Sequence, residues 1–125
     1  MKRNIDLIRE ILKYIEENIS IDNPTNVILS DYSKEEISYH LQLLDDAGMV
    51  RIKDESDSSG LDFWVYGLTW NGHEFLEAAK NKNIWETAKK YVKEKAGGIP
   101  FTVLQNVLLK IITGELKIPE GSVGF

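Results

Sequence analysis

Hydrophobic residues recur every three or four positions near the start of the chain, and charged residues fill the positions between them. This spacing is typical of an amphipathic helix, because it gathers the apolar side chains on one face. We therefore predict a helix over residues 2–18, which cannot continue through Pro24. The apolar positions of this pattern are Ile5, Ile8, Leu12, Ile15 and Ile19.

The next stretch predicts a short strand followed by a second helix. Residues 27–30 are rich in β-branched side chains, which favours a strand. Ser33 and Glu36 have the spacing of a capping box, in which each side chain binds the other residue's backbone amide at a helix start. Gly48 supplies a residue that ends a helix in the left-handed conformation. Between these signals the inward face of the helix is predicted to hold Ile37, Leu41 and Leu44.

Residues 49–53 and 63–69 alternate apolar and polar side chains, as strands with one buried face do. The segment between them is polar and contains a glycine, as a hairpin loop does. We expect this loop to be mobile rather than tight, because it is long and acidic. The two strands would form a small β-hairpin, called the wing below.

Helical patterns return after the wing. Thr69 is predicted to cap a helix over residues 70–80, and Asn81 to break or kink the junction with a further helix over residues 84–92. Two glycines then stop that helix, and Pro100 suits the first position of a last, strongly apolar helix. Residues 114–125 are predicted to be frayed.

These elements predict a mainly α fold with a small β-wing, more narrowly a winged helix-turn-helix variant extended by two C-terminal helices. Residues 1–80 would form a winged-helix-like core. Residues 81–125 would form a helical extension packed on the same domain. A chain of 125 residues has the length of one such domain.

Charge is distributed unevenly along the chain, whose net charge is −5. Residues 31–57 carry eight acidic and three basic side chains, whereas residues 80–95 carry six lysines and two glutamates. The chain has no cysteine, which excludes disulfides and thiolate metal sites. It shows no signal-peptide pattern and no apolar segment long enough to span a bilayer, so we expect a soluble, cytoplasmic protein without membrane association.

Four stretches together resemble one family, the uncharacterised bacterial and prophage family named only as domain of unknown function 2513. They read MKRNIDLIREIL, YSKEEISYHLQLLDDAGMV, LTWNGHEFLEAAKN and IWETAKKYVKEKAGGIP. The second is also similar to the junction between recognition helix and wing in small bacterial repressors. The resemblance implies a winged-helix-like fold and gives no established activity. One departure is physical: a helix-turn-helix needs a positioning helix before the recognition helix, and residues 20–32 favour a loop and strand instead.

If the second helix contacts nucleic acid or a protein partner, its contact residues would be Lys34, Ser38, Tyr39, His40 and Gln42. The wing would add Arg51 and Lys53, and the later basic helix Lys89, Lys90 and Lys93. Acidic residues oppose phosphate binding, because a like-charge contact at about 4 Å costs roughly 1 kcal/mol even in a water-like dielectric. A solvated helix face is therefore the alternative interpretation, and a solvated basic face is the alternative for the lysines.

Two further groups of residues have a structural and a functional interpretation. Two histidine–glutamate pairs, spaced four apart on helices, match zinc-ligand spacing, although core-edge histidines with a hydrogen bond explain the same spacing. Three aromatic residues are expected to stack in the core or at the junction of the wing and the next helix, with an exposed partner-binding patch as the alternative. The two groups are Glu36, His40, His73 and Glu77, and Trp64, Tyr66 and Trp70.

No catalytic motif, cofactor loop or small-molecule site is recognisable, so we predict a non-enzymatic protein without a cofactor. The leading hypothesis is a small regulatory protein that binds nucleic acid. The alternative is a protein-interaction module that uses its acidic helix and wing, or its basic helix, to bind a partner protein or a second copy of itself.

Overall fold

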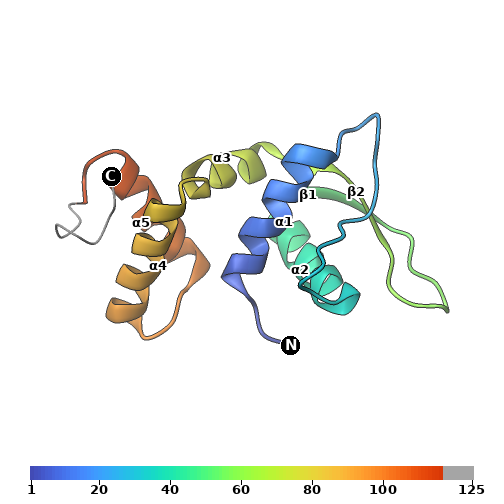
Figure 1. Ribbon diagram of the computed structural model, residues 1–125, viewed down its shortest axis with the longest axis horizontal. Coiled ribbons are helices and arrows are strands. Elements are labelled where there is room, and N and C mark those ends of the chain that lie inside the picture. The colour runs from blue at the N-terminus through green and yellow to red at the C-terminus, as the bar shows by residue number, and fades with distance from the viewer. Residues whose placement is uncertain (117–125) are drawn as a thin grey trace. The chain divides into compact units, whose positions relative to one another are not determined.

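The computed structural model describes residues 1–116 and divides the chain into two compact units, Met1–Glu74 and a second unit that begins at Phe75. The fold is mainly helical with a small two-stranded antiparallel sheet, as predicted (Figure 1). The elements in chain order are α1 (Ile5–Asn18), α2 (Lys34–Asp46), β1 (Val50–Asp54), β2 (Phe63–Leu68), α3 (Trp70–Ala79), α4 (Lys82–Ala96) and α5 (Phe101–Ile112).

The helix α1 begins three residues later than predicted, because Asn4 caps it. The Asn4 side chain accepts hydrogen bonds from the amides of Asp6 and Leu7, at 3.0 and 3.2 Å. These bonds satisfy amides that have no partner inside the helix. The predicted apolar face is buried and forms the core of the first unit, with the most enclosed side chains being Leu7, Ile11, Leu12 and Ile15.

Both ends of α2 form as the sequence predicts. Ser33 and Glu36 make the capping box at its start. At its end Gly48 has φ +69, and the amide of Met49 reaches back to the carbonyl of Leu44 at 2.9 Å. This is the bond pattern of a helix closed by a left-handed residue. The predicted inward residues Ile37, Leu41 and Leu44 are all buried.

The segment between α1 and α2 contains no helix, and the strand predicted at residues 27–30 is wrong. Instead Thr25 makes an isolated antiparallel bridge with Val65 of β2, through two backbone hydrogen bonds of 3.2 and 3.0 Å. The amide group of the Asn26 side chain then donates to the Phe63 carbonyl at 3.0 Å. In a continued antiparallel ladder that carbonyl would accept a hydrogen bond from the backbone amide of Val27. Because the Asn26 side chain occupies it, the pairing stops after one bridge.

The wing forms as an antiparallel pair of β1 and β2, with a register shift between Arg51 and Ile52. Its loop is more tightly folded than expected, since Asp57 and Gly60 exchange backbone hydrogen bonds at 3.1 Å. The Ser56 hydroxyl also accepts from the amide of Asp62 at 2.9 Å. Side chains that bond their own backbone neighbours fold the loop, which acidity and length alone did not predict.

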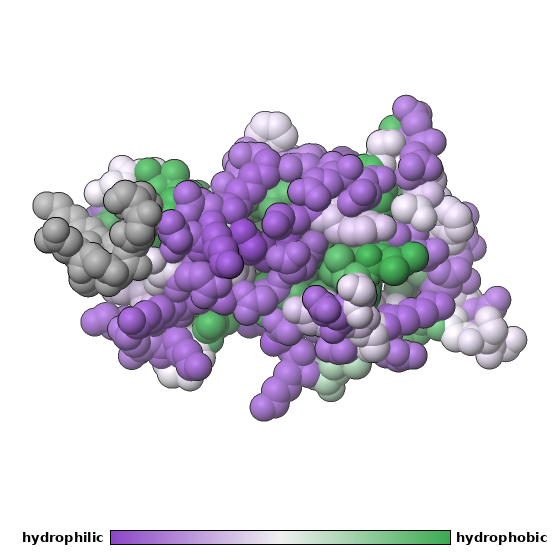
Figure 2. All heavy atoms as spheres, viewed as in Figure 1, coloured by the Kyte–Doolittle hydropathy of each residue, from purple (hydrophilic) through white to green (hydrophobic). Residues whose placement is uncertain are grey.

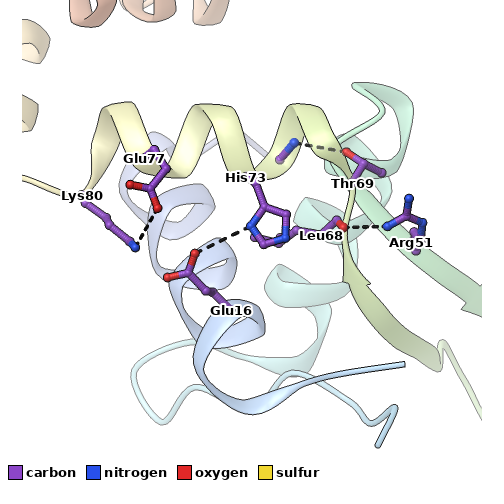
Figure 3. Close-up of polar contacts among 8 residues, drawn as sticks. Glu16, Arg51, Leu68, Thr69, His73, Glu77 and Lys80 are labelled. Carbon is purple, nitrogen blue, oxygen red and sulfur yellow. Dashed lines mark hydrogen bonds and ion pairs between the residues drawn. The ribbon is translucent and has the colours of Figure 1, made fainter. Parts of the chain in front are cut away.

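The wing continues directly into α3 through a close approach of two backbones. Thr69 caps α3 by accepting from the Gly72 amide at 3.1 Å, and its own amide donates to the Met49 carbonyl at 3.0 Å (Figure 3). A side chain at Gly72 would collide with that same Met49 carbonyl. Glycine is therefore required here for packing.

The second unit has an aromatic core. Phe75 stacks on Phe101 with ring centroids 4.6 Å apart and meets Trp85 edge to face at 6.1 Å. Asn81 caps α4 by accepting from the amide of Ile84, and α4 ends at Gly97 with φ +75. Because Phe75 belongs to this core, the division between the units lies inside α3, whereas the sequence placed it after residue 80.

The remaining boundaries are the start of α5 and the C-terminal tail. Pro100 occupies the capping position of α5 rather than its first helical residue. Most of the tail predicted to be frayed, residues 117–125, lies outside the described residues. Across the part of the chain that the structure describes, no helix is both long and apolar enough to cross a lipid bilayer.

Replacing Gly72 with Ala is expected to lower the free energy of unfolding by about 2–3 kcal/mol, because the new methyl group forces the Met49 carbonyl away. Urea denaturation followed by far-UV circular dichroism measures this change. Gly98→Ala is the matched control, since Gly98 has open space around it and should change by less than about 0.5 kcal/mol. Equal stability of the two variants would contradict the close approach.

Candidate functional site

Two of the contact residues predicted on α2 are not at the surface. The side chains of Ser38 and His40 are only 4% and 1% exposed, so neither projects from the helix surface. His40 lies three residues after Ile37 and four before Leu44, which places it on the buried face of the helix. The remaining predicted residues of α2, which are exposed or half-buried, are Lys34, Tyr39 and Gln42.

His40 instead joins α2 to the start of α1. Its Nε2 accepts a hydrogen bond from the backbone amide of Asn4 at 2.8 Å, and its Nδ1 lies 2.7 Å from the carbonyl of Glu36. A backbone amide can only donate, so Nε2 carries the lone pair and Nδ1 donates to the carbonyl. The interpretation of His40 as a hydrogen-bonded core histidine is confirmed.

The other members of the possible zinc set are occupied by separate partners. The Glu36 carboxylate accepts from the Ser33 amide, and His73 is exposed, with its Nδ1 3.7 Å from Glu16. Glu77 pairs with Lys80 at 2.9 Å, as Figure 3 shows. Within residues 1–116 no three histidine or carboxylate side chains are grouped as metal ligands.

The basic residues of the wing are held by nearby groups. Arg51 donates to the carbonyl of Leu68 at 2.8 Å across the hairpin, as Figure 3 shows, and Lys53 forms an ion pair with Glu55 at 3.2 Å. Both side chains remain at the surface, but each already has an acceptor. Their role in contacting a partner stays a prediction.

The basic helix α4 offers fewer free lysines than the sequence indicates. Lys89 is only 16% exposed, because it lies 5.7 Å from the centre of the Trp85 ring and pairs with Glu86 at 3.3 Å. Cation–π contact and ion pairing hold it on its own unit. Of the three predicted contact residues of α4, Lys90 and Lys93 are fully exposed.

The aromatic residues do not stack together in the core as expected. Trp70 is 76% exposed at the first position of α3, and Trp64 is 37% exposed. Trp64 alternates along β2 with the buried Phe63 and Val65, so the two-residue period places it on the outer side of the wing. The core-stacking prediction is wrong for Trp70, whereas Tyr66 is half-buried.

A cluster of carboxylates faces solvent where α2 ends. Asp45 and Asp46 of the last turn and Asp54 of β1 line a pocket of about 400 Å³, together with Gln42, Ile52 and Phe63. In the described part of the chain none of these three carboxylates forms an ion pair. This pocket is called the acidic pocket below.

The acidic pocket works against the stability of α2. Unpaired carbonyls make the C-terminal end of a helix partly negative, so a carboxylate there costs about 0.3–1 kcal/mol. Asp45 and Asp46 lie at that end, and the last turn contains no basic residue. Hydrogen bonds from Ser56 hold the pKa of Asp54 below its usual value, which favours its charged form. The pocket therefore carries negative charge that no ion pair in residues 1–116 neutralises.

A second pocket of about 290 Å³ lies beside the N-terminal half of α2 and is largely apolar. The loop between α1 and α2 forms one wall, and Figure 2 shows a hydrophobic patch in that region with hydrophilic atoms around it. Ile28 of the loop is 72% exposed. This apolar pocket is lined by Asn26, Val27, Ile28, Leu29, Tyr32, Lys34, Ile37, Ser38, Leu41, Asp62 and Phe63.

The mouth of the apolar pocket is electrically negative. Burial raises the pKa of the Tyr32 hydroxyl, and nearby carboxylates raise it further because they oppose a second negative charge. These carboxylates belong to Asp6, Glu10, Asp31 and Glu36.

The two units carry net charges of opposite sign. Residues 1–74 carry fifteen acidic and seven basic side chains, a net charge of −8, and the remainder of the chain carries five acidic and eight basic side chains, a net charge of +3. Both pockets lie in the acidic unit.

Sequence reasoning found the acidic residues but not the pockets. Its strongest overlooked signal was the pair Asp45–Asp46 directly before the helix stop at Gly48, where basic residues are the stabilising choice. The apolar pocket had no such signal, because its wall is the loop that was predicted to be a strand.

Comparison with known proteins places the chain in a family. Residues 2–98 match the family described as "Hypothetical protein (DUF2513)". The chain belongs to this family. A relative described as "Uncharacterized protein", from Haemophilus influenzae (strain ATCC 51907 / DSM 11121 / KW20 / Rd), is 33% identical over 120 residues, which cover 93% of this chain and 99% of the relative. No solved structure matches the chain significantly.

Neither the DUF2513 description nor that of the relative states an activity. Function in this member of the family is therefore inferred from its surface, in which the acidic pocket, the apolar pocket and the exposed residues of α2 lie on the same unit.

His40→Ala is expected to lower the free energy of unfolding by about 2–3 kcal/mol, because it leaves the Asn4 amide and the Glu36 carbonyl without partners and opens a cavity. His73→Ala is the matched control and should cost less than about 1 kcal/mol, since it removes only an exposed ion pair. Urea denaturation compares the two. A larger loss for His73→Ala would contradict the structural role of His40.

Proposed function

We propose that the protein is a non-enzymatic interaction module of regulatory type, which binds a basic surface of a partner protein through the acidic face of α2 and β1. The observation that carries this proposal is the acidic pocket, which Asp45, Asp46 and Asp54 line without forming an ion pair in residues 1–116. A lysine or arginine of a partner would supply the missing positive charge.

The energetics of the isolated fold support a binding role for this pocket. Three carboxylates of the same charge line one pocket, and two of them oppose the helix dipole as well. A feature that costs stability without an internal compensation is expected at functional sites. A bound cation would offset the negative charge of the carboxylates and would interact favourably with the negative end of the helix dipole.

The charge of the whole unit supports the same class of partner. A net charge of −8 on residues 1–74 attracts a basic surface over roughly a Debye length and repels a polyanion. Complementary charge mainly raises the rate of association and the selectivity for the partner. The partner would therefore be recognised first by its charge.

Nucleic-acid binding, the other hypothesis, has less support from this surface. It rests on the order of helix, helix and wing and on the exposed candidates Lys34, Gln42, Lys90 and Lys93. Against it, Ser38 and His40 are buried, and no positioning helix precedes α2. Few cations are present near α2 to neutralise phosphates, from which DNA binding draws most of its affinity.

A titration with two fluorescent probes tests the proposal. A fluorescein-labelled peptide of alternating arginine and glycine should bind the full chain at low salt and weaken as salt is raised, because the contact is ionic. A random-sequence DNA duplex should not bind. Salt-sensitive binding of the duplex without binding of the peptide would overturn the proposal and favour nucleic acid.

The variant Asp45→Asn/Asp46→Asn should bind the arginine peptide about fivefold to tenfold more weakly, as expected for the loss of two surface charge contacts. Glu17→Gln/Asp22→Asn removes the same charge at exposed positions outside the pocket and should change the affinity by less than about twofold. Equal losses in both variants would show that only net charge matters and would overturn the assignment of the site.

A further inference from the structure

We propose that α2 and the loop before it form a two-part groove for a peptide segment of the partner, in which a large apolar side chain enters the apolar pocket and a basic side chain enters the acidic pocket. This inference rests on the proposed function and adds the apolar anchor to it. The occupant is therefore an amphipathic basic segment rather than a uniformly basic surface.

The two pockets take their α2 residues from successive turns of the helix. The apolar pocket takes Lys34, Ile37, Ser38 and Leu41 from α2, and the acidic pocket takes Gln42, Asp45 and Asp46 from the turns that follow. Phe63 of β2 lines both pockets, so one buried ring separates them. A single bound segment can therefore reach both.

The size of the apolar pocket fits a side chain. Its volume of about 290 Å³ lies just below the range of roughly 300–1,000 Å³ found for sites that enclose small molecules. Its walls include five large aliphatic residues and two aromatic rings, with Ser38 and Asn26 among the polar groups. A leucine or phenylalanine would find apolar contacts there.

The rim of the apolar pocket exposes hydrophobic surface, which a bound partner would remove from water. Ile28 is 72% exposed at the rim, and the hydrophobic patch in Figure 2 lies in the region of its loop. Covering apolar surface contributes about 25 cal/mol per Å². Asp62 lines the same pocket, and residues 1–74 carry a net charge of −8, so a partner segment with positive charge is favoured over a neutral one.

The separation of the two pockets along α2 also sets the spacing between the two anchoring side chains of the bound segment. The two sets of α2 residues are centred about seven positions apart, which is roughly 10 Å along the helix at about 1.5 Å per residue. An extended peptide covers that distance in about three residues. The expected pattern is thus an apolar side chain and a basic side chain about three positions apart.

Nuclear magnetic resonance titration of the nitrogen-15-labelled full chain tests this pattern and measures weak affinities. The main probe is a decapeptide of glycine and serine that carries one leucine and, three residues later, one arginine. Two control peptides replace either the leucine or the arginine with serine. The main peptide should bind about tenfold more tightly than either control, as expected for burying one leucine side chain or pairing one charge.

Two exposed isoleucines give a matched pair of variants. Ile28→Asp places a charge on the rim of the apolar pocket and should remove the advantage of the leucine peptide over the leucine-free one. Ile21→Asp makes the same change at a position that is 76% exposed and does not line the pocket, so that advantage should persist. Amide shifts should appear at residues 27–29 for the main peptide and not for the leucine-free control.

The outcomes separate this inference from the proposed function. Equal binding of the peptides with and without leucine, together with unchanged affinity in Ile28→Asp, would overturn the apolar anchor while charge recognition stands. Binding of the arginine-free peptide as tight as that of the main peptide would overturn both the acidic half of the groove and the proposed function.

Discussion

Burial of one face of α2 is the constraint on which the surface of the first unit depends. The helix must direct Ile37, Leu41 and Leu44 inward to complete the core, and the hydrogen bonds of His40 to Asn4 and Glu36 fix its position relative to α1. Once that face is fixed, Gln42, Asp45 and Asp46 can only face outward. The negative surface is therefore a direct result of how the core is packed.

The segment between α1 and α2 has the second largest influence on the site. A helix-turn-helix would place a helix here, and it would cover the side of α2 that now borders the apolar pocket. In this chain the segment makes one bridge to β2 and then turns away as a loop. The fold thus combines α2 and a two-stranded wing with an exposed apolar wall beside α2.

Local signals in the sequence predicted the elements well. The capping box of Ser33 and Glu36, the stop at Gly48 and the alternation along β2 each depend on neighbours in the chain, and all are confirmed.

The site was harder to predict, because its geometry depends on contacts between distant segments. Ser38 and His40 were chosen for their chemistry, although the helical period of Ile37 and Leu44 already directed His40 inward. Exposure of Trp70 and the enclosure of Lys89 by Trp85 depend on packing that no local pattern carries. The strand at residues 27–30 failed because one side chain, Asn26, competes with the backbone for the Phe63 carbonyl.

That competition gives Asn26 an influence beyond its own bonds. Its amide occupies the Phe63 carbonyl, which a third strand would need for its next backbone hydrogen bond. The free edge of β2 is thus closed to further pairing at that carbonyl, and the loop after Asn26 forms the apolar wall beside α2 instead. One polar side chain therefore protects a sheet edge while the neighbouring backbone borders a pocket.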